Sequence, residues 1–275
     1  MILADLHVHT YFSSDSDTLP KFQIEKALEI GLKSICITDH QDYDAAPWIP
    51  YPHLNFLLKE TGDAEPYFKE LLELKDEYAG RIEVLIGIEL GLQKHLVEKF
   101  ERFLTDHPFD FVIGSTHRIG DFDCADKRFY AGRTAKEIYT DYFLAEVEAI
   151  RAFSGFDVIG HIDFVMRHLE RGLEPFKYSD YGDIIDEMLK IMIDQGRGIE
   201  CNTTPLVKGI PEPNPNLQIL RRYKELGGEI ITFGSDSHET WRIGENFDIA
   251  MEMVKACGFQ YYTVFRQRKP YFYKM

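Results

Sequence analysis

The sequence predicts an α/β fold in which parallel strands close into a barrel, and three observations support this. Short apolar runs alternate with amphipathic helical patterns about seven times, and such alternation is typical of a parallel sheet with crossover helices. No Ser/Gly-rich linker divides the 275 residues, a length common for one barrel. No GxGxxG turn follows the first strand, so an open doubly wound sheet is the less favoured alternative. We therefore expect one domain spanning residues 1–275.

The predicted elements follow one another in a regular order. The first strand ends in His7-Val8-His9, and a polar loop leads to Pro20, a residue suited to the start of a helix over 21–32. A long loop at about 42–65, rich in proline and aromatic residues, is expected to lie over a pocket. Further strands are predicted at 34–40, 82–90, 109–117, 156–163, 198–203 and 229–238. Further helices are predicted at 66–78, 94–104, 135–153, 180–195, 215–226 and 244–257, before a strand-like piece at 260–265 with a basic, aromatic tail.

Composition excludes several classes of partner. The chain has 46 acidic and 31 basic residues and a net charge of -15, so a general nucleic-acid or anionic-membrane surface is not expected. A small phosphorylated substrate remains compatible if a locally positive site, such as a metal centre, receives it. No apolar run reaches ~18 residues and the start has no basic, signal-like region, so we expect a cytoplasmic protein. The widely spaced cysteines are expected to be buried thiols: Cys36, Cys124, Cys201 and Cys257.

Histidines and carboxylates gather at the predicted strand ends. Residues at i and i+2 of a strand share one face, so the imidazoles of His7 and His9 should point to the same place. In a barrel all C-terminal strand ends meet on one face, which is where barrel enzymes place their sites. Nitrogen and oxygen ligands of this kind suit Zn²⁺, Mn²⁺ or Fe²⁺. The residues concerned are His7, His9, His40, Glu89, His117, His161, Asp236 and His238; the other histidines, His53, His95, His107 and His168, are interpreted as surface or loop residues.

Six short motifs occur in the order found in the PHP (polymerase and histidinol phosphatase) family, which the chain resembles over essentially its whole length. Within the family it is most similar to the stand-alone bacterial histidinol-phosphate phosphatases, through Phe12-Ser-Ser-Asp-Ser16 and Ile199-Glu-Cys-Asn-Thr203. The motifs are His7-Val-His9, Thr38-Asp-His40, Gly87-Ile-Glu89, Ser115-Thr-His117, Gly160-His161 and Ser235-Asp-Ser-His238.

The resemblance implies a distorted (β/α)7 TIM-like barrel with three divalent metal ions, Zn, Mn or Fe, at the C-terminal strand ends. Asp39 is expected to orient a ligand rather than to bind metal. For the last ligand position Asp17 competes with Asp15. By the same resemblance the first metal would be held by His7, His9, Glu89 and Asp236, the second by Glu89, His117 and His161, and the third by His40, His238 and Asp15.

The resemblance also implies the reaction, hydrolysis of L-histidinol phosphate to L-histidinol and phosphate in histidine biosynthesis. A hydroxide bridging two metals would attack the phosphorus in line, and the expected catalytic set is Glu89, Asp236, His238 and Arg167. Arginine is favoured for bidentate phosphate contact, and related phosphatases use arginines after strands five and six. Arg167 matches the first, whereas Lys208 stands at the second. The candidate phosphate-binding residues are Arg167, Lys208, Arg118 and Asn202; each basic residue has a surface charge, and Asn202 with Thr203 a strand-end structural role, as the alternative.

Two other functions remain open. One is a PHP phosphoesterase that acts on another small phosphate ester or on a nucleic acid end, although the acidic balance disfavours the latter. The other is a metal-free binding module, which the complete set of ligand-type residues disfavours. The native metal, the oligomeric state and the recognition of the substrate amine and imidazole stay open, with Asp42, Asp44 and Glu60 as acidic residues that could meet an amine.

Overall fold

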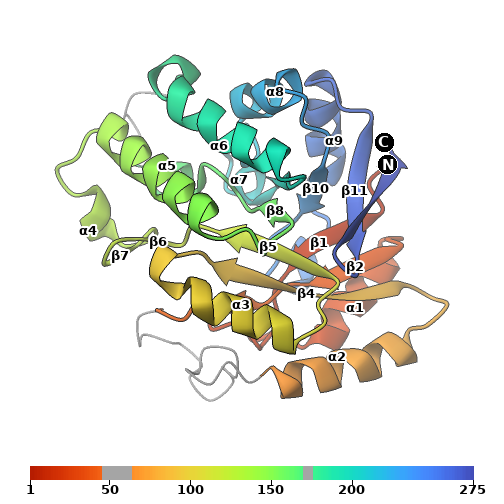
Figure 1. The fold of residues 1–275 in the computed structure, drawn as a ribbon. Helices are drawn as coiled ribbons and strands as arrows, with labels where there is room; N and C mark the ends of the chain where they lie inside the picture. The colour runs from red at the N-terminus through yellow and green to blue at the C-terminus, as the bar shows by residue number, and fades with distance from the viewer. Residues whose placement is uncertain (45–63, 170–175) are drawn as a thin grey trace.

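Seven parallel strands form the barrel in a computed structural model that describes residues 1–44, 64–169 and 176–275 (Figure 1). In spatial order they are β1 (Ala4–Val8), β2 (Ser34–Ile37), β4 (Glu83–Gly91), β5 (Phe111–Ser115), β8 (Val158–Ile159), β9 (Gly198–Asn202) and β10 (Ile231–Gly234). The short β3 (His40–Gln41) follows β2 and also pairs with β4. The first and last strands then meet, since Asp236 N donates to His7 O and His9 N to Ser237 O, both at 2.8 Å. The sheet is therefore a nearly closed barrel, and the predicted fold class is confirmed.

Helices connect successive strands and pack around the barrel, as Figure 1 shows. Their ends follow local sequence signals. Pro20 begins α1, a Thr134–Glu137 capping box begins α5, and the Asn216 side chain caps α8. The helices that follow the barrel strands are α1 (Pro20–Glu29), α2 (Glu65–Glu77), α3 (Val97–Asp106), α5 (Ala135–Ala152), α6 (Gly182–Asp194), α8 (Leu217–Glu225) and α9 (Phe247–Ala256). Shorter pieces are η1 (Lys94–Leu96), α4 (Lys127–Tyr130), η2 (Phe164–Arg167), η3 (Tyr178–Asp180), α7 (Thr204–Val207) and η4 (Thr240–Arg242).

Several predicted strands end earlier in the structure than expected, and two of them end four residues early. The strand predicted at 156–163 is only Val158–Ile159, and that predicted at 229–238 is Ile231–Gly234. The chain leaves the extended conformation just beyond each of them, because His161 has φ 23° and Asp236 has φ 53°. Both residues stand at the C-terminal end of the barrel. The departures from regular strand geometry therefore coincide with predicted ligands.

The C-terminal tail forms a hairpin that the sequence analysis describes only as a strand-like piece. Strands β11 (Tyr261–Arg266) and β12 (Lys269–Lys274) pair antiparallel. Arg266 donates to Glu83 at the start of β4, and Arg268 Nε donates to Asp157 Oδ2, 2.6 Å away, just before β8. The hairpin therefore lies at the N-terminal end of the barrel, opposite the predicted ligands. A second small hairpin, β6 (Arg118–Ile119) with β7 (Phe122–Asp123), follows β5 and was not predicted.

All four cysteines are buried and free, as predicted. Among the residues that the structure describes, no helix has the length and apolar character needed to cross a membrane. Most of the long loop predicted at about 42–65, with His53 and Glu60, lies outside the described residues. The extent of the domain, 1–275, stays a prediction.

Candidate metal centre

The carboxylate of Glu89, at the C-terminal end of β4, lies at the centre of the predicted ligands. Its Oε2 is 3.2 Å from His7 Nε2, 3.5 Å from His9 Nε2 and 2.8 Å from His40 Nδ1. Its Oε1 is 3.2 Å from His117 Nε2 and 2.9 Å from His161 Nε2. One buried carboxylate thus faces five imidazoles from four strand ends, with a different group of histidines at each oxygen.

His7 and His9 lie together on one side of Glu89. They project from the end of β1, both fully buried, with ring centroids 4.9 Å apart, as the i, i+2 spacing predicts. Asp236, after β10, completes this side: its Oδ1 is 3.3 Å from His9 Nε2 and 3.7 Å from His7 Nε2. Both histidines expected around a first metal therefore contact both of the expected carboxylates, Glu89 and Asp236.

The His238 ring stacks on the His9 ring with centroids 4.1 Å apart. The His40 ring is tilted, with its centroid 4.2 Å from that of His9 and 5.8 Å from that of His238. Asp15 is the acidic residue of the first loop that reaches them, with Oδ2 3.1 Å from His238 Nε2 and Oδ1 3.7 Å from His40 Nε2. Among the contacts of the described residues, Asp17 makes no such approach. The geometry thus favours Asp15 over Asp17.

Burial and charge shape the ionisation of this cluster. Burial alone would raise the pKa of Glu89, but the charges of His7, His117 and His40 hold it well below its usual range. Burial lowers the pKa of His9 well below the ordinary value of histidine, and the neighbouring His238 and His40 lower it further. Glu89 is therefore anionic, and His9 is a neutral imidazole with a lone pair that a metal could use.

The donor atoms fit metal ions. Within the part of the chain that the structure describes, His7 Nε2, His9 Nε2, His40 Nδ1 and Glu89 Oε2 are buried and lie near one another, but none of them makes a hydrogen bond with good geometry. Buried polar atoms normally have partners, so the cluster requires an explanation that a bound ion supplies. Three overlapping triads have ligand atoms within 4.8 Å of one another: His7, His9 and Glu89; His9, His40 and His238; and His40, Glu89 and His117.

A layer of polar side chains behind the predicted ligands orients them. His9 Nδ1 contacts Ser13 Oγ at 3.0 Å, and Ser13 Oγ donates to Asp39 Oδ1 at 2.6 Å. Asp39 thus acts on His9 through Ser13, in agreement with its expected indirect role. Asp42 was a candidate for binding the amine of the substrate. Its Oδ1 instead lies 2.9 Å from His117 Nδ1.

Arg167 lies inside the cluster. It comes from η2, after β8, and its side chain is only 3% exposed. It donates through Nη1 to Asp236 Oδ2 at 2.9 Å, through Nη2 to Asn202 Oδ1 at 2.7 Å, and through Nε to Asn214 Oδ1 at 2.6 Å. Asp236 therefore presents one oxygen to the imidazoles and the other to Arg167.

The other phosphate-binding candidates occupy different surroundings. Lys208, after α7, is exposed. Partial desolvation and the charges of Arg167 and Arg242 nevertheless lower its pKa, against the opposing effect of Asp236. Because Lys208 is close enough to be affected by the charges of Arg167 and Asp236, it lies on the Arg167 side of the cluster. Arg118 instead donates to Asp121 O within the β6–β7 hairpin at 2.8 Å, so the structure does not bring it onto the cluster.

The remaining described histidines lie outside the cluster. His95 is exposed and contacts Asp44, and His107 Nδ1 lies 2.8 Å from Phe103 O at the end of α3. His168 is half-buried beside Phe164, and burial lowers its pKa to about 4. These placements agree with their interpretation as surface or loop residues.

Two side chains beside the predicted ligands were not predicted from the sequence. Glu200 Oε1 lies 2.6 Å from His7 Nδ1, and Arg242 Nη2 donates to Thr204 Oγ1 at 2.9 Å. Glu200 belongs to a motif used for the family resemblance, but no role was assigned to it. A charged residue within the otherwise buried strand β9 is the signal that could have identified it.

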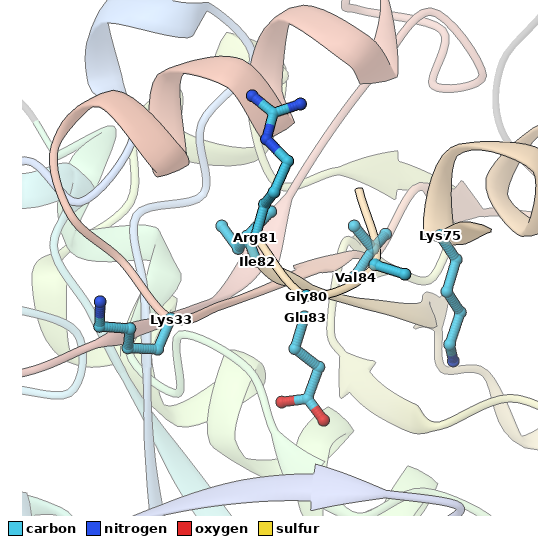
Figure 2. A pocket seen from close by; sticks show the side chains of 8 residues that line it. Lys33, Lys75, Gly80, Arg81, Ile82, Glu83 and Val84 are labelled. Atoms are coloured by element: carbon cyan, nitrogen blue, oxygen red, sulfur yellow. The ribbon is translucent and has the colours of Figure 1, made fainter. Parts of the chain in front are cut away.

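A surface cavity of about 430 Å³ lies beside β4, away from the cluster. Although Lys33, Lys75 and Arg81 line it, Figure 2 shows Lys75 and Arg81 pointing in different directions. Lys75 Nζ also lies 3.2 Å from Asp110 Oδ2, and this carboxylate neutralises part of the lysine's charge. These cations do not converge on a common point, so the cavity is a weaker candidate than the metal-ligand cluster.

The parallel barrel and its histidine–carboxylate cluster define a metal-dependent barrel enzyme. The family model of the PHP domain matches residues 5–204, and the chain belongs to this family. It is 30% identical over 269 residues to the histidinol-phosphatase of Lactococcus lactis, covering 96% of this chain and 95% of that protein. It is 35% identical over 260 residues to a probable histidinol-phosphatase of Clostridium acetobutylicum, covering 92% and 93%.

A solved structure agrees with these relatives. The Lactococcus lactis histidinol phosphate phosphatase, complexed with zinc, L-histidinol and phosphate, superposes with a TM-score of 0.82 at 29% identity, covering 98% of each chain. The predicted family is confirmed. The predicted barrel has a close counterpart in that structure.

Proposed function

We propose that this protein is a metal-dependent phosphomonoesterase that hydrolyses L-histidinol phosphate to L-histidinol and phosphate, a step of histidine biosynthesis. The observation that carries the proposal is the buried Glu89 carboxylate facing five imidazoles at the barrel mouth. The relatives named as histidinol-phosphatases, which align over nearly the whole chain, support the substrate.

The centre would hold three divalent ions. Zinc is the first choice because the Lactococcus lactis structure contains it, while the nitrogen and oxygen donors also suit Mn²⁺ and Fe²⁺. When bound, such ions lower the pKa of water and neutralise charge on phosphate oxygens. The proposed ligands are His7, His9, Asp15, His40, Glu89, His117, His161, Asp236 and His238, and Glu89 would be shared between two ions.

Arg167 would receive the phosphate. Its guanidinium is held by Asn202, Asn214 and Asp236, so little side-chain freedom remains to be lost when a substrate arrives. A guanidinium fixed in this way favours a directional contact with a phosphate oxygen. Lys208 would add positive charge on the same side, and Asn202 would act by orienting Arg167.

The first experiment is elemental analysis of the purified full-length chain, followed by phosphate release from L-histidinol phosphate and from a panel of sugar phosphates, nucleotides and nitrophenyl phosphate. We expect about three metal ions per chain and a kcat/KM for L-histidinol phosphate well above that of every panel member. Protein without metal affinity would refute the centre. Bound metal with no preference over nitrophenyl phosphate would refute the substrate and favour a phosphoesterase for another small ester.

A further inference from the structure

Glu200 contacts two predicted ligands from behind, although it is not one of them. It lies in the middle of β9, between β8 and β10, and is 1% exposed. Its Oε1 is 2.6 Å from His7 Nδ1, and its Oε2 accepts a hydrogen bond from His161 N at 2.9 Å. Asn202 Nδ2 also donates to Oε2 at 3.2 Å. One buried carboxylate thus links residues at the ends of β1, β8 and β9.

The contact with His7 determines which ring nitrogen faces the centre. A hydrogen on Nδ1 is donated to Glu200, which leaves the lone pair on Nε2. That Nε2 lies 3.2 Å from Glu89 Oε2 and 3.7 Å from Asp236 Oδ1, where the first metal is proposed. Glu200 therefore fixes both the tautomer and the ring orientation that metal binding requires.

The contact with His161 supports an unusual backbone conformation. His161 has φ 23°, a region that residues other than glycine rarely adopt. Its backbone N–H is bonded to Glu200, and its ring then places Nε2 2.9 Å from Glu89 Oε1. The Glu200 carboxylate thus also holds His161, a proposed ligand of the second metal, in position.

Gly234, in the neighbouring strand β10, supplies the space for this arrangement. A Cβ at that position would lie 2.2 Å from Glu200 Oε1 and 2.4 Å from the Cβ of His7. Any larger residue would therefore displace the carboxylate, the imidazole or both. The close packing of the Glu200–His7 pair depends on glycine at this position.

We propose that Glu200 is a positioning residue that sets His7 and His161 for two metals at once. Through Asn202, whose Oδ1 accepts from Arg167 Nη2 at 2.7 Å, it also connects the metal centre to the proposed phosphate-binding arginine. The inference rests on the proposed metal centre, but not on the identity of the substrate. Glu200 touches no reacting atom and acts through its neighbours.

The test compares Glu200→Gln with wild type and with Glu146→Gln. Glutamine keeps the shape of the side chain, but it cannot accept from His7 and His161 at the same time. Glu146 is an equally buried carboxyl on α5, next to Tyr142 and away from the ligands, so it is a matched control. Metal-free full-length proteins are titrated with Zn²⁺ against a chelator of known affinity, and thermal unfolding checks that each is folded.

We expect Glu200→Gln to bind zinc about 10- to 100-fold more weakly, the range for partners of metal ligands, and Glu146→Gln to match wild type within twofold. Excess zinc should restore part of the lost kcat. Wild-type affinity in folded Glu200→Gln overturns the inference, whereas absence of zinc binding by wild type refutes the metal centre itself.

A second measurement does not depend on the folding of the variant. Nitrogen-15 shifts of the histidine rings in zinc-loaded wild-type protein should place the His7 proton on Nδ1 and the metal on Nε2. Coordination through Nδ1 would overturn the role assigned to Glu200.

Discussion

Replacing Arg167 by alanine tests whether this residue binds phosphate or only holds a metal ligand. The substitution removes a buried guanidinium that donates to Asp236, Asn202 and Asn214 at 2.6–2.9 Å. Asp236 Oδ2 keeps weaker hydrogen bonds from Asn202 Nδ2 and Thr204 Oγ1, both at 3.3 Å. The carboxylate is therefore expected to stay in place, and the ions to remain bound.

The size of the effect follows from the loss of a charged donor. A hydrogen bond to a charged group contributes about 1.5–3 kcal/mol, and a factor of ten in rate corresponds to about 1.4 kcal/mol. If the lost interaction is with the phosphate, kcat/KM for L-histidinol phosphate should fall about 10- to 150-fold. Zinc content should stay at the wild-type value.

Steady-state phosphate release and elemental analysis on the same preparation check this prediction. Arg128→Ala is the matched control, because that side chain is 78% exposed and pairs with Asp126 in a separate part of the surface. A kcat/KM within twofold of wild type would refute the phosphate role of Arg167. Loss of zinc would instead show that Arg167 acts by holding Asp236.

Three further changes have defined outcomes. Glu89→Gln should release at least one zinc per chain and lower kcat more than about 100-fold, since breaking a buried charge pair costs about 3–5 kcal/mol; unchanged zinc content by elemental analysis would contradict this. Glu146→Gln should stabilise the protein above pH 4.5: burial raises the pKa of Glu146 well above 4.5, so wild-type stability falls as pH rises toward that folded pKa. Denaturant unfolding at pH 5 and 7 should show that the difference in unfolding free energy between Glu146→Gln and wild type widens by up to about 1.4 kcal/mol per pH unit. A constant difference would contradict the raised pKa of Glu146. Removing residues 1–9 should abolish zinc binding and hydrolysis together, because β1 closes the barrel and the removed residues include the predicted ligands His7 and His9; a truncated protein that still turns over substrate would refute the centre.

The barrel and the approximate place of the histidine–carboxylate cluster were predictable because both depend on local patterns. Buried strands appear as short apolar runs, and a histidine at the end of such a run is conspicuous. The parallel topology then brings residues as distant in sequence as His7 and Asp236 to the same end of the barrel. In the structure their side chains lie within 3.7 Å of each other, as that argument requires.

The rest depends on packing that leaves little trace in a single sequence. Gln267 and Arg268 turn the β11–β12 hairpin with φ of 49° and 64°, without the Asn-Gly or Asp-Gly pair that usually marks such a turn. Asn214 is far in sequence from Arg167, yet it accepts that residue's Nε hydrogen bond at 2.6 Å. Neither feature has a periodicity that could reveal it.

Two of the predicted ligands have left-handed backbone conformations, which hydrogen bonds from neighbouring strands hold in place. His161 and Asp236 follow the two strands that flank β9, and their φ values are 23° and 53°. Such conformations cost about 1–3 kcal/mol each and persist where the surroundings hold them. Here the backbone N–H of His161 bonds to Glu200, and that of Asp236 bonds to His7 O. Because Glu200 also contacts the His7 ring, the correct placement of β1 and β9 supports both conformations. The fold thus positions these two predicted ligands without needing an ion to do so.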